Sequence, residues 1–158
     1  RVVLGSIKKT KVLPLNNFFL SYRKTKLKKG QFIHSIRIPL FMENIFKSYK
    51  ISKRFDDDIS SVCAAFNLKV KNKKIKSIRV AYGGMASIPK RATYCEKILL
   101  NSSMSEQIID KAKEALEKDF KPISDMRASR KYRMEVAKNL LHKCFLEIKQ
   151  KKLIRINI

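Results

Sequence analysis

The most constraining feature of this sequence is a strict alternation of apolar side chains over residues 60–70. The alternating apolar positions are Val62, Ala64, Phe66, Leu68 and Val70. A period of two places these side chains on one face of a β-strand. The opposite face carries Cys63 and Ala65, which are small enough to be covered as well. We therefore expect a long strand whose apolar face lies in the core.

A second strand is expected to return beside the first one. Residues Lys71–Lys74 are polar and basic, which is typical of a hairpin turn, and the apolar segment Ile75–Tyr82 follows. Ile78 and Val80 are the core candidates of this returning strand. Further strands are expected upstream, over Arg1–Asn17 (one or two strands), Gln31–Ile38 and Ile45–Ile51.

The periodicity changes from two to 3.6 after Gly83-Gly84, which indicates helices. The first helix is expected from the favourable first-turn residue Pro89 to about Leu99. Ser103 and Glu106 have the spacing of a capping box and predict the start of a second helix. A third helix is expected over about Ser129–Lys149.

Strands followed by helices predict an α+β fold. We expect an antiparallel sheet of three to four strands, followed by about three helices that pack on one face of the sheet. The apolar stripes of the strands and helices should meet in a single core. Its expected members are Val62, Ala64, Phe66, Leu68, Ile78, Val80, Ile109, Leu116, Val136, Leu140, Leu141 and Phe145.

The chain carries a large excess of positive charge. It has 37 Lys and Arg against 13 Asp and Glu, which gives a net charge of +24. Such a charge favours nucleic-acid binding, and a basic nucleic-acid-binding domain is the alternative from another class. However, the basic residues are spread over almost the whole chain, with no zinc finger, basic zipper or RNA-recognition aromatic pattern. A basic, solvated surface is therefore the favoured interpretation, and nucleic acid is not an expected partner.

The sequence indicates neither a metal site nor a membrane segment. Cys63, Cys95 and Cys144 lie far apart among apolar residues, in no spacing that binds zinc or an iron–sulfur cluster. We expect them to be buried thiols in a reducing, cytoplasmic compartment. His34 and His142 are isolated, and structural roles are expected for both. No apolar run approaches the roughly 18 residues of a membrane span, and no signal peptide is visible.

Three short segments stand out by their residue types. Asp56-Asp57-Asp58 sets three carboxylates side by side, either in a charged loop at a site or in a polar turn. Metal binding is a third and least favoured interpretation, because the DxDxDG pattern of a calcium loop is missing. Gly83-Gly84 permits a close backbone approach, but the surrounding residues lack the spacing of a phosphate-binding loop. Asp125 and Arg127 flank the start of the last helix, which favours a structural ion pair and a cap, with Ser129 as a capping candidate. No catalytic residue is assigned in this chain.

Several segments follow one another in a fixed order along the chain. They are Phe18-Phe19, Tyr22-Arg23-Lys24-Thr25, Ser35-Ile36-Arg37-Ile38-Pro39, Tyr49–Ile59, Ala81–Ala86, Ser124–Ser129 and Tyr132-Arg133. Together they resemble the C-terminal part of the FAD-binding region of the xanthine dehydrogenase family, over roughly residues 12–149. The small iron–sulfur/flavin subunit of bacterial members is the nearest look-alike. This lobe resembles the carbon monoxide dehydrogenase flavoprotein C-terminal domain, an antiparallel sheet followed by helices.

The resemblance implies the organisation and the cofactors. Residues 1–25 would end the preceding FAD-binding lobe, residues 26–149 would form the C-terminal domain, and residues 150–158 would be a tail. The family consists of molybdenum hydroxylases that pass electrons from a molybdopterin site through two 2Fe–2S clusters to FAD and then to NAD. The implied partners are the upstream FAD-binding lobes, an iron–sulfur domain and a molybdopterin-binding subunit. The FAD pyrophosphate loops lie upstream in the family. Because the chain starts with Arg1, we expect a part of a longer, NAD-dependent enzyme that is inactive alone.

The resemblance also implies site residues. Ile33 matches a position that meets the flavin, and Lys50 matches a lysine that contacts it. Asp57 matches an acid beside the isoalloxazine and nicotinamide sites. The segment that shapes the access of NAD to the flavin matches Lys53, Arg54, Phe55, Asp56, Asp57 and Asp58.

The sequence identifies the family more specifically than it identifies the substrate that the enzyme oxidises. Phe55 stands where animal members carry a second Arg of their dehydrogenase–oxidase switch, whereas bacterial members carry Phe, so that switch is not transferred. The motif of residues 53–59 favours xanthine dehydrogenase, which oxidises hypoxanthine and xanthine. The flavoprotein part of a carbon monoxide, aldehyde or nicotinate dehydrogenase is the alternative, since the molybdenum subunit selects the substrate.

Overall fold

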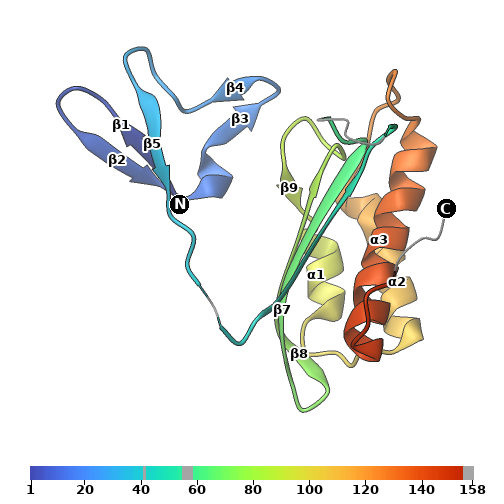
Figure 1. Cartoon of the computed structure of the whole chain (residues 1–158). Coiled ribbons are helices and arrows are strands. Elements are labelled where there is room, and N and C mark those ends of the chain that lie inside the picture. The colour runs from blue at the N-terminus through green and yellow to red at the C-terminus, as the bar shows by residue number, and fades with distance from the viewer. Residues whose placement is uncertain (41, 55–58, 155–158) are drawn as a thin grey trace. The chain divides into compact units, whose positions relative to one another are not determined.

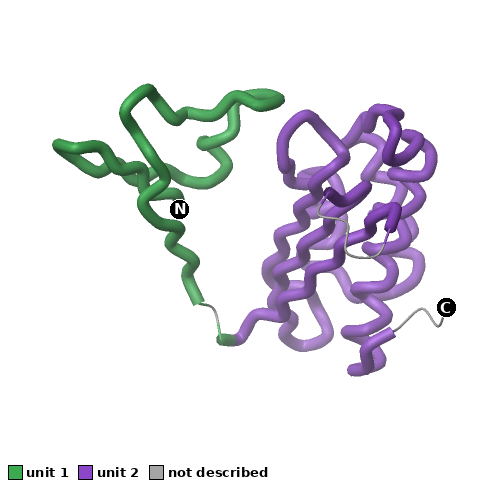
Figure 2. Tube along the Cα trace, turned by 45° about the horizontal axis from the view of Figure 1, so that its top comes forward, with its two compact units in different colours: residues 1–42 green, residues 43–158 purple. Residues whose placement is uncertain are grey.

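The computed structural model describes residues 1–40, 42–54 and 59–154. The chain divides into two compact units, unit 1 over residues 1–42 and unit 2 over residues 43–158 (Figure 2). Unit 2 contains the long hairpin and the helices on which the predicted fold class depends.

Unit 1 is built from short antiparallel strands (Figure 1). Its elements are β1 (Val2–Gly5), β2 (Thr10–Leu13), the 3-10 helix η1 (Leu15–Asn17), β3 (Phe19–Ser21), β4 (Lys24–Thr25) and β5 (Phe32–Ile36). β1 lies between β2 and β5 in one sheet, and β3 pairs with β4 in another. Val2, Leu4 and Phe18 form its small core. The strands predicted within residues 1–17 and 31–38 are thus present.

Unit 2 has an α+β fold, as the order of strands and helices predicts. Its elements are β6 (Ile45–Ile51), β7 (Val62–Lys71), β8 (Lys74–Gly83), β9 (Lys90–Arg91), α1 (Thr93–Leu99), α2 (Glu106–Asp119) and α3 (Arg130–Gln150). The strands form one antiparallel sheet in the order β6-β7-β8-β9. α1, α2 and α3 lie on one face of this sheet (Figure 1). We call the opposite face the open face.

The core of unit 2 lies between the sheet and the helices. All the predicted core residues are buried except Val136, which is half-buried and packs against the others. The register of the hairpin pairs Phe66 with Val80 and Leu68 with Ile78. Both strands therefore present their apolar positions to the same helices, which confirms the predicted face assignment.

Two hairpins turn through residues other than glycine that have a positive φ. Asn72 (φ 52°) and Lys73 (φ 58°) form the predicted turn between β7 and β8. Positive φ at both central positions matches the twist of the flanking strands. In unit 1, Arg23 (φ 56°) turns β3 into β4, where Thr25 pairs with Phe19. A strand pair therefore forms in the segment that lies between the two predicted strand regions, residues 1–17 and residues 31–38.

The first helix of unit 2 begins later than predicted. Pro89 does not open a helix, because Lys90–Arg91 pair with β8 as the short strand β9. The backbone N–H of Ala92 then donates to the carbonyl of Val80 (2.8 Å). α1 begins only at Thr93, after this last sheet contact. The prediction was wrong because the local sequence does not reveal pairing with a strand that precedes it.

The predicted capping box is also wrong. Ser105, not Ser103, is the N-cap of α2, and its side chain makes no capping hydrogen bond. Ser103 instead bridges Lys74 at the far end of the hairpin. The Glu106 carboxylate lies 3.1 Å from Nε2 of His142 on α3. Glu106 therefore faces the neighbouring helix rather than closing its own N-terminus.

Phe66 and Leu140 represent the sheet side and the helix side of the core. We expect Phe66→Ala and Leu140→Ala each to lower the free energy of unfolding by about 3 kcal/mol, because each leaves a cavity in a packed core. Urea unfolding followed by circular dichroism measures the loss. The matched control is Phe46→Ala, at a position of β6 that is 62% exposed; it should cost less than about 1 kcal/mol. Losses below about 1 kcal/mol for both core variants would contradict the face assignment.

Candidate functional site

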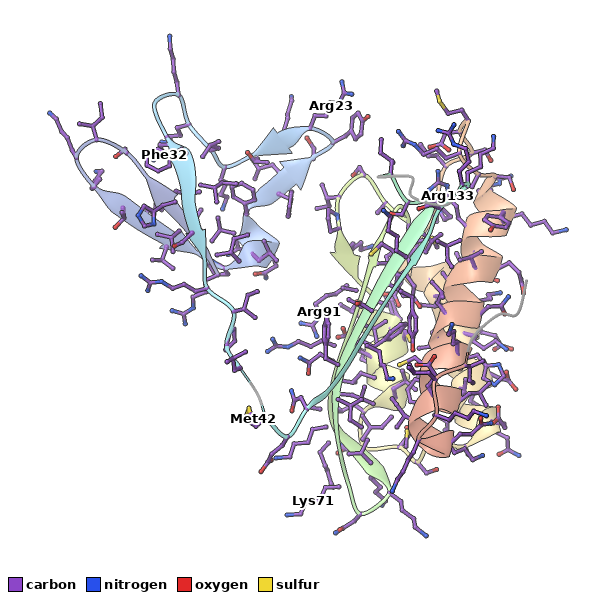
Figure 3. All side chains as sticks on the ribbon, viewed as in Figure 1. Arg23, Phe32, Met42, Lys71, Arg91 and Arg133 are labelled. Carbon is purple, nitrogen blue, oxygen red and sulfur yellow. The ribbon has the colours of Figure 1, made fainter. Side chains whose placement is uncertain are left out.

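The open face carries the outward-pointing side chains of β6 to β9. The pairing register places Lys50, Cys63 and Gly83 side by side at one end of the sheet, and we call these residues the Lys50 row. The next row consists of Ser48, Ala65, Ala81 and Arg91. The side chain of Arg91 extends away from the helices (Figure 3).

Most side chains in these two rows are small. A Cβ added to Gly83 would meet only the Cβ of Cys63, at 3.6 Å, so this glycine borders open space. Lys50 is exposed on the edge strand β6, and among the described residues it has no ion-pair partner. Arg91, at the other edge, donates from Nε to Glu96 Oε1 (2.9 Å). This surface allows a flat ring to approach the backbone and offers a positive charge at the edge.

The structure describes some of the predicted site residues. Ile33 lies in β5 of unit 1 and is 48% exposed, whereas Lys50 lies in unit 2. Lys53 and Arg54 follow β6 and are exposed, and Lys53 Nζ donates to the carbonyl of Met126 (3.5 Å). Four predicted site residues lie outside the described residues: Phe55, Asp56, Asp57 and Asp58.

A buried arginine fixes the same end of the sheet from the helix side. Arg133 of α3 is 3% exposed and lies where α3 meets the end of the sheet (Figure 3). Its Nη1 donates to the carbonyl oxygens of Ser61 and Gly84, the latter at 3.0 Å. Its Nη2 donates to Asp125 Oδ1 (2.6 Å). We call Arg133, Ser61, Gly84 and Asp125 the Arg133 clamp, because they join the segments before β7, after β8 and before α3.

Asp125 also organises the turn that leads into α3. Its Oδ1 accepts hydrogen bonds from the backbone N–H groups of Arg127 (2.9 Å) and Ala128 (3.2 Å). The bond from Arg127 is the main cause that holds the pKa of Asp125 below its ordinary value, and Arg133 adds to it. Ser129 caps α3 with its side chain. The predicted cap by Ser129 is confirmed, whereas the ion pair of Asp125 forms with Arg133 and not with Arg127, which contributes only its backbone N–H.

Sequence reasoning did not identify Arg133 as a central residue. A signal was present, because Arg133 has helical spacing to Ala137, Leu140 and Cys144, which form the buried stripe of α3. A basic residue within such a stripe requires polar partners when it is buried. The carbonyl partners of Arg133 lie 49 and 72 residues away, so the sequence alone does not name them.

The cysteines do not form a reactive site. Cys95 and Cys144 are buried, as predicted. Burial raises the pKa of both thiols, that of Cys144 to about 12, which keeps them protonated at neutral pH. Cys63 is only half-buried, because its position on β7 turns it to the open face. Full burial of Cys63 was therefore a wrong prediction.

Within residues 1–40, 42–54 and 59–154, His, Cys, Asp and Glu side chains form no cluster of three or more that could hold a metal ion. The helices of the same ranges are all too short or too polar to cross a membrane.

Gly84 is the tightest point of the Arg133 clamp. Its φ is +78°, and an added Cβ would lie 2.3 Å from the carbonyl oxygen of Ser61. We expect Gly84→Ala to lower the free energy of unfolding by about 2 kcal/mol or more, because the new methyl displaces a strand end and the left-handed backbone adds strain. Gly83→Ala is the matched control, with only one ordinary contact; it should cost less than about 1 kcal/mol. Urea unfolding compares them, and equal losses would contradict the clamp geometry.

Two relatives show what the sequence is similar to. The glyceraldehyde dehydrogenase medium chain of Sulfolobus acidocaldarius is 28% identical over 147 residues, which cover 93% of this chain and 52% of that protein. The xanthine dehydrogenase of Emericella nidulans is 33% identical over 123 residues, which cover 75% of this chain and 9% of that protein. The chain thus spans about half of the first relative and a small part of the second.

Solved structures share the fold. Quinoline 2-oxidoreductase from Pseudomonas putida 86 matches with a TM-score of 0.83 at 20% identity, over 97% of this chain and 53% of that chain. Carbon monoxide dehydrogenase from Hydrogenophaga pseudoflava matches with a TM-score of 0.82 at 22% identity, over 89% of this chain and 49% of that chain. At these identities the likeness concerns the fold.

The sequence pattern of one protein family covers most of unit 2. The family described as the CO dehydrogenase flavoprotein C-terminal domain matches residues 47–148, from β6 to the end region of α3. This match covers more than half of the chain and includes the Lys50 row and the Arg133 clamp. The chain therefore belongs to the family of CO dehydrogenase flavoprotein C-terminal domains, which confirms the resemblance found in its sequence.

Proposed function

We propose that this chain is the C-terminal domain of the flavin-binding part of a molybdenum hydroxylase, and that its open face meets the flavin. In the complete enzyme, electrons would pass from a molybdopterin site through 2Fe–2S clusters to FAD and on to NAD, during oxidation of hypoxanthine or xanthine. The observation that carries the proposal is an exposed Lys50 beside small side chains, on the surface of a domain from a flavoprotein family.

The residues of the open face fit the ring of a flavin better than its pyrophosphate. The ring needs a flat, open surface, and Gly83 and Cys63 border such a space. A pyrophosphate needs a cradle of free backbone N–H groups. Gly83 of β8 pairs with Cys63 of β7, and the Ser61 carbonyl fills the space beside Gly84. We therefore assign the pyrophosphate to the upstream lobes of the complete protein, and a ring contact to Lys50. For Ile33, in unit 1, the proposed flavin contact rests on the family resemblance alone.

FAD, when bound, supplies the redox chemistry that links one-electron carriers to a two-electron acceptor. The task of this chain is electrostatic and steric. The Lys50 ammonium would stabilise negative charge on the reduced ring, and the small residues Cys63 and Gly83 would let the ring lie close to the strands. The acidic segment Asp56-Asp57-Asp58 follows β6 in the sequence and would shape the approach of the anionic nicotinamide dinucleotide.

A second substrate class is supported by one observation. The glyceraldehyde dehydrogenase relative aligns with 93% of this chain at 28% identity, whereas a xanthine dehydrogenase FAD-binding subunit of Escherichia coli O157:H7 aligns with the same share at 23% identity. An aldehyde-oxidising enzyme is therefore the second candidate, while the segment of residues 53–59 favours purine oxidation. Steady-state assays of the complete enzyme with xanthine and with glyceraldehyde, each with NAD and with an artificial acceptor, decide between the two. Turnover of glyceraldehyde alone would reject the purine proposal.

Lys50 provides the first test of the flavin site. In the full-length protein with FAD bound, Lys50→Gln removes a positive charge near the ring. The two-electron midpoint potential of FAD should then fall by about 20–80 mV, which corresponds to about 1–4 kcal/mol. Spectroelectrochemical titration measures this potential.

The matched control for this experiment is Lys76→Gln, which makes the same change at an exposed position of β8 near the hairpin turn. Its effect on the potential should stay within about 10 mV, because solvent and salt screen a distant charge. Equal shifts for the two variants would remove Lys50 from the flavin site.

Asp57 provides the second test, because the proposal assigns it to the NAD side of the flavin. Asp57→Asn should change the rate or the NAD affinity of flavin reoxidation about tenfold, through the lost charge. Reduction by substrate at the molybdenum site should keep its wild-type rate. Rapid-mixing kinetics measure the two half-reactions separately. Wild-type reoxidation by NAD would mean that this segment is only a polar turn.

A further inference from the structure

The Arg133 clamp and the Lys50 row lie on opposite faces of the same sheet end. The clamp holds the carbonyl of Ser61, and the N–H of Ser61 donates to the carbonyl of Ile51 (2.8 Å). Ile51 is the neighbour of Lys50 at the end of β6. The clamp also holds the carbonyl of Gly84, the neighbour of Gly83. The guanidinium is thus connected to the backbone of Lys50 through Ser61 and Ile51, and to the backbone of Gly83 through Gly84.

The clamp leaves little freedom for adjustment. A Cβ on Gly84 would meet the Ser61 carbonyl at 2.3 Å and Arg133 Nη1 at 3.1 Å. Three different segments converge on one guanidinium, whose planar fork offers several donors in fixed directions. A lysine ammonium at the end of a flexible chain cannot reproduce this geometry. A displacement of α3 is therefore transmitted to the ends of β7 and β8 together.

A second connection ties the clamp to the chain that follows Lys50. Lys53 Nζ donates to the carbonyl of Met126 (3.5 Å), and Ser61 Oγ donates to the carbonyl of Arg127 (3.4 Å). Met126 and Arg127 lie in the turn that the Asp125 carboxylate organises. The turn that Asp125 organises therefore contacts the β6–β7 connection on both sides, at Lys53 and at Ser61.

A contribution to the stability of the fold does not by itself explain why Arg133 is buried. A buried ion pair contributes little compared with well-packed apolar side chains, because both charges lose water. Nε of Arg133 is buried and has no hydrogen-bond partner among the described residues. This arrangement adds desolvation cost while it fixes the direction of the guanidinium. We propose that Arg133 is a positioning residue, which sets the Lys50 row at the geometry required by the flavin ring; this rests on the proposed function.

The test uses Arg133→Met, which keeps length and burial but removes the donors. Arg130→Met, at an exposed position in the first turn of α3, is the matched control. The first measurement is the rate at which Ellman's reagent modifies Cys63 in this chain without flavin, since Cys95 and Cys144 are buried. We expect an increase of about tenfold for Arg133→Met and a wild-type rate for the control, because loosening the sheet end exposes the thiol.

The second measurement is the midpoint potential of FAD in the full-length protein. Lys50→Gln should shift it in the wild-type background and should have little further effect in the Arg133→Met background, because Lys50 is then no longer positioned. A role in stability alone would lower the melting temperature and leave both measurements unchanged, and that result would overturn the proposal. Rescue by Arg133→Lys of both measurements would also overturn it, since the proposal requires the planar fork.

The experiment remains decisive if the Arg133→Met variant does not fold or if the wild-type protein does not bind FAD. If Arg133→Met does not fold, Asp125→Asn takes its place. It keeps the guanidinium and leaves an Oδ1 that can still accept from the N–H groups of Arg127 and Ala128, but it removes the charge that pairs with Arg133. The same two measurements then apply, with the same expected directions. If the wild-type full-length protein binds no FAD, the proposed function fails. The Cys63 modification rate still decides whether Arg133 fixes the Lys50 row, and a rate equal to the control rejects the proposal.

Discussion

The organisation of unit 2 depends on one buried guanidinium. Arg133 must find several acceptors, because a charge that loses its water is stable only with hydrogen-bond partners. The acceptors come from the start of β7, the end of β8 and the turn before α3. Segments that are scattered over the sequence are thereby held at one end of the sheet. Gly84 is glycine for the same reason, since a side chain would occupy the space of the Ser61 carbonyl.

Other scarce carboxylates of this basic chain also serve internal contacts. Asp119, at the end of α2, accepts from the backbone N–H groups of Tyr94 and Cys95 and so closes the start of α1. Glu147 of α3 accepts from Tyr49 and pairs with Lys47 of β6. Burial raises the pKa of Glu147, but these two bonds hold it below its ordinary value. Asp119 and Glu147 therefore stabilise the packing of unit 2 and are not part of the open face.

The sequence predicted those strands and helices whose hydrophobic periodicity lies within the element itself. The alternation along β7 and β8 and the stripe of α3 determine the core, because each period selects one buried face. β9 was missed, since its two residues form a strand only by pairing with Ala81 and Tyr82. The cap of α1 by Asp119 was missed because it joins residues 24 to 26 positions apart. Local propensity contains no information about such contacts.

The residues of the candidate site also divide into those that a local sequence pattern predicts and those that only the folded sheet brings together. Lys50 was predicted as a site residue from a family motif, whereas its neighbours Cys63 and Gly83 follow from strand register, which only the assembled sheet defines. Helix packing fixes one face of this sheet, so side chains on the other face are free to be small without loss of the core. A surface of this kind suits a planar ligand held mainly by other parts of a protein. Under the proposed function, the packed core would make the strands rigid, and the few exposed residues on those strands would contribute to the redox centre.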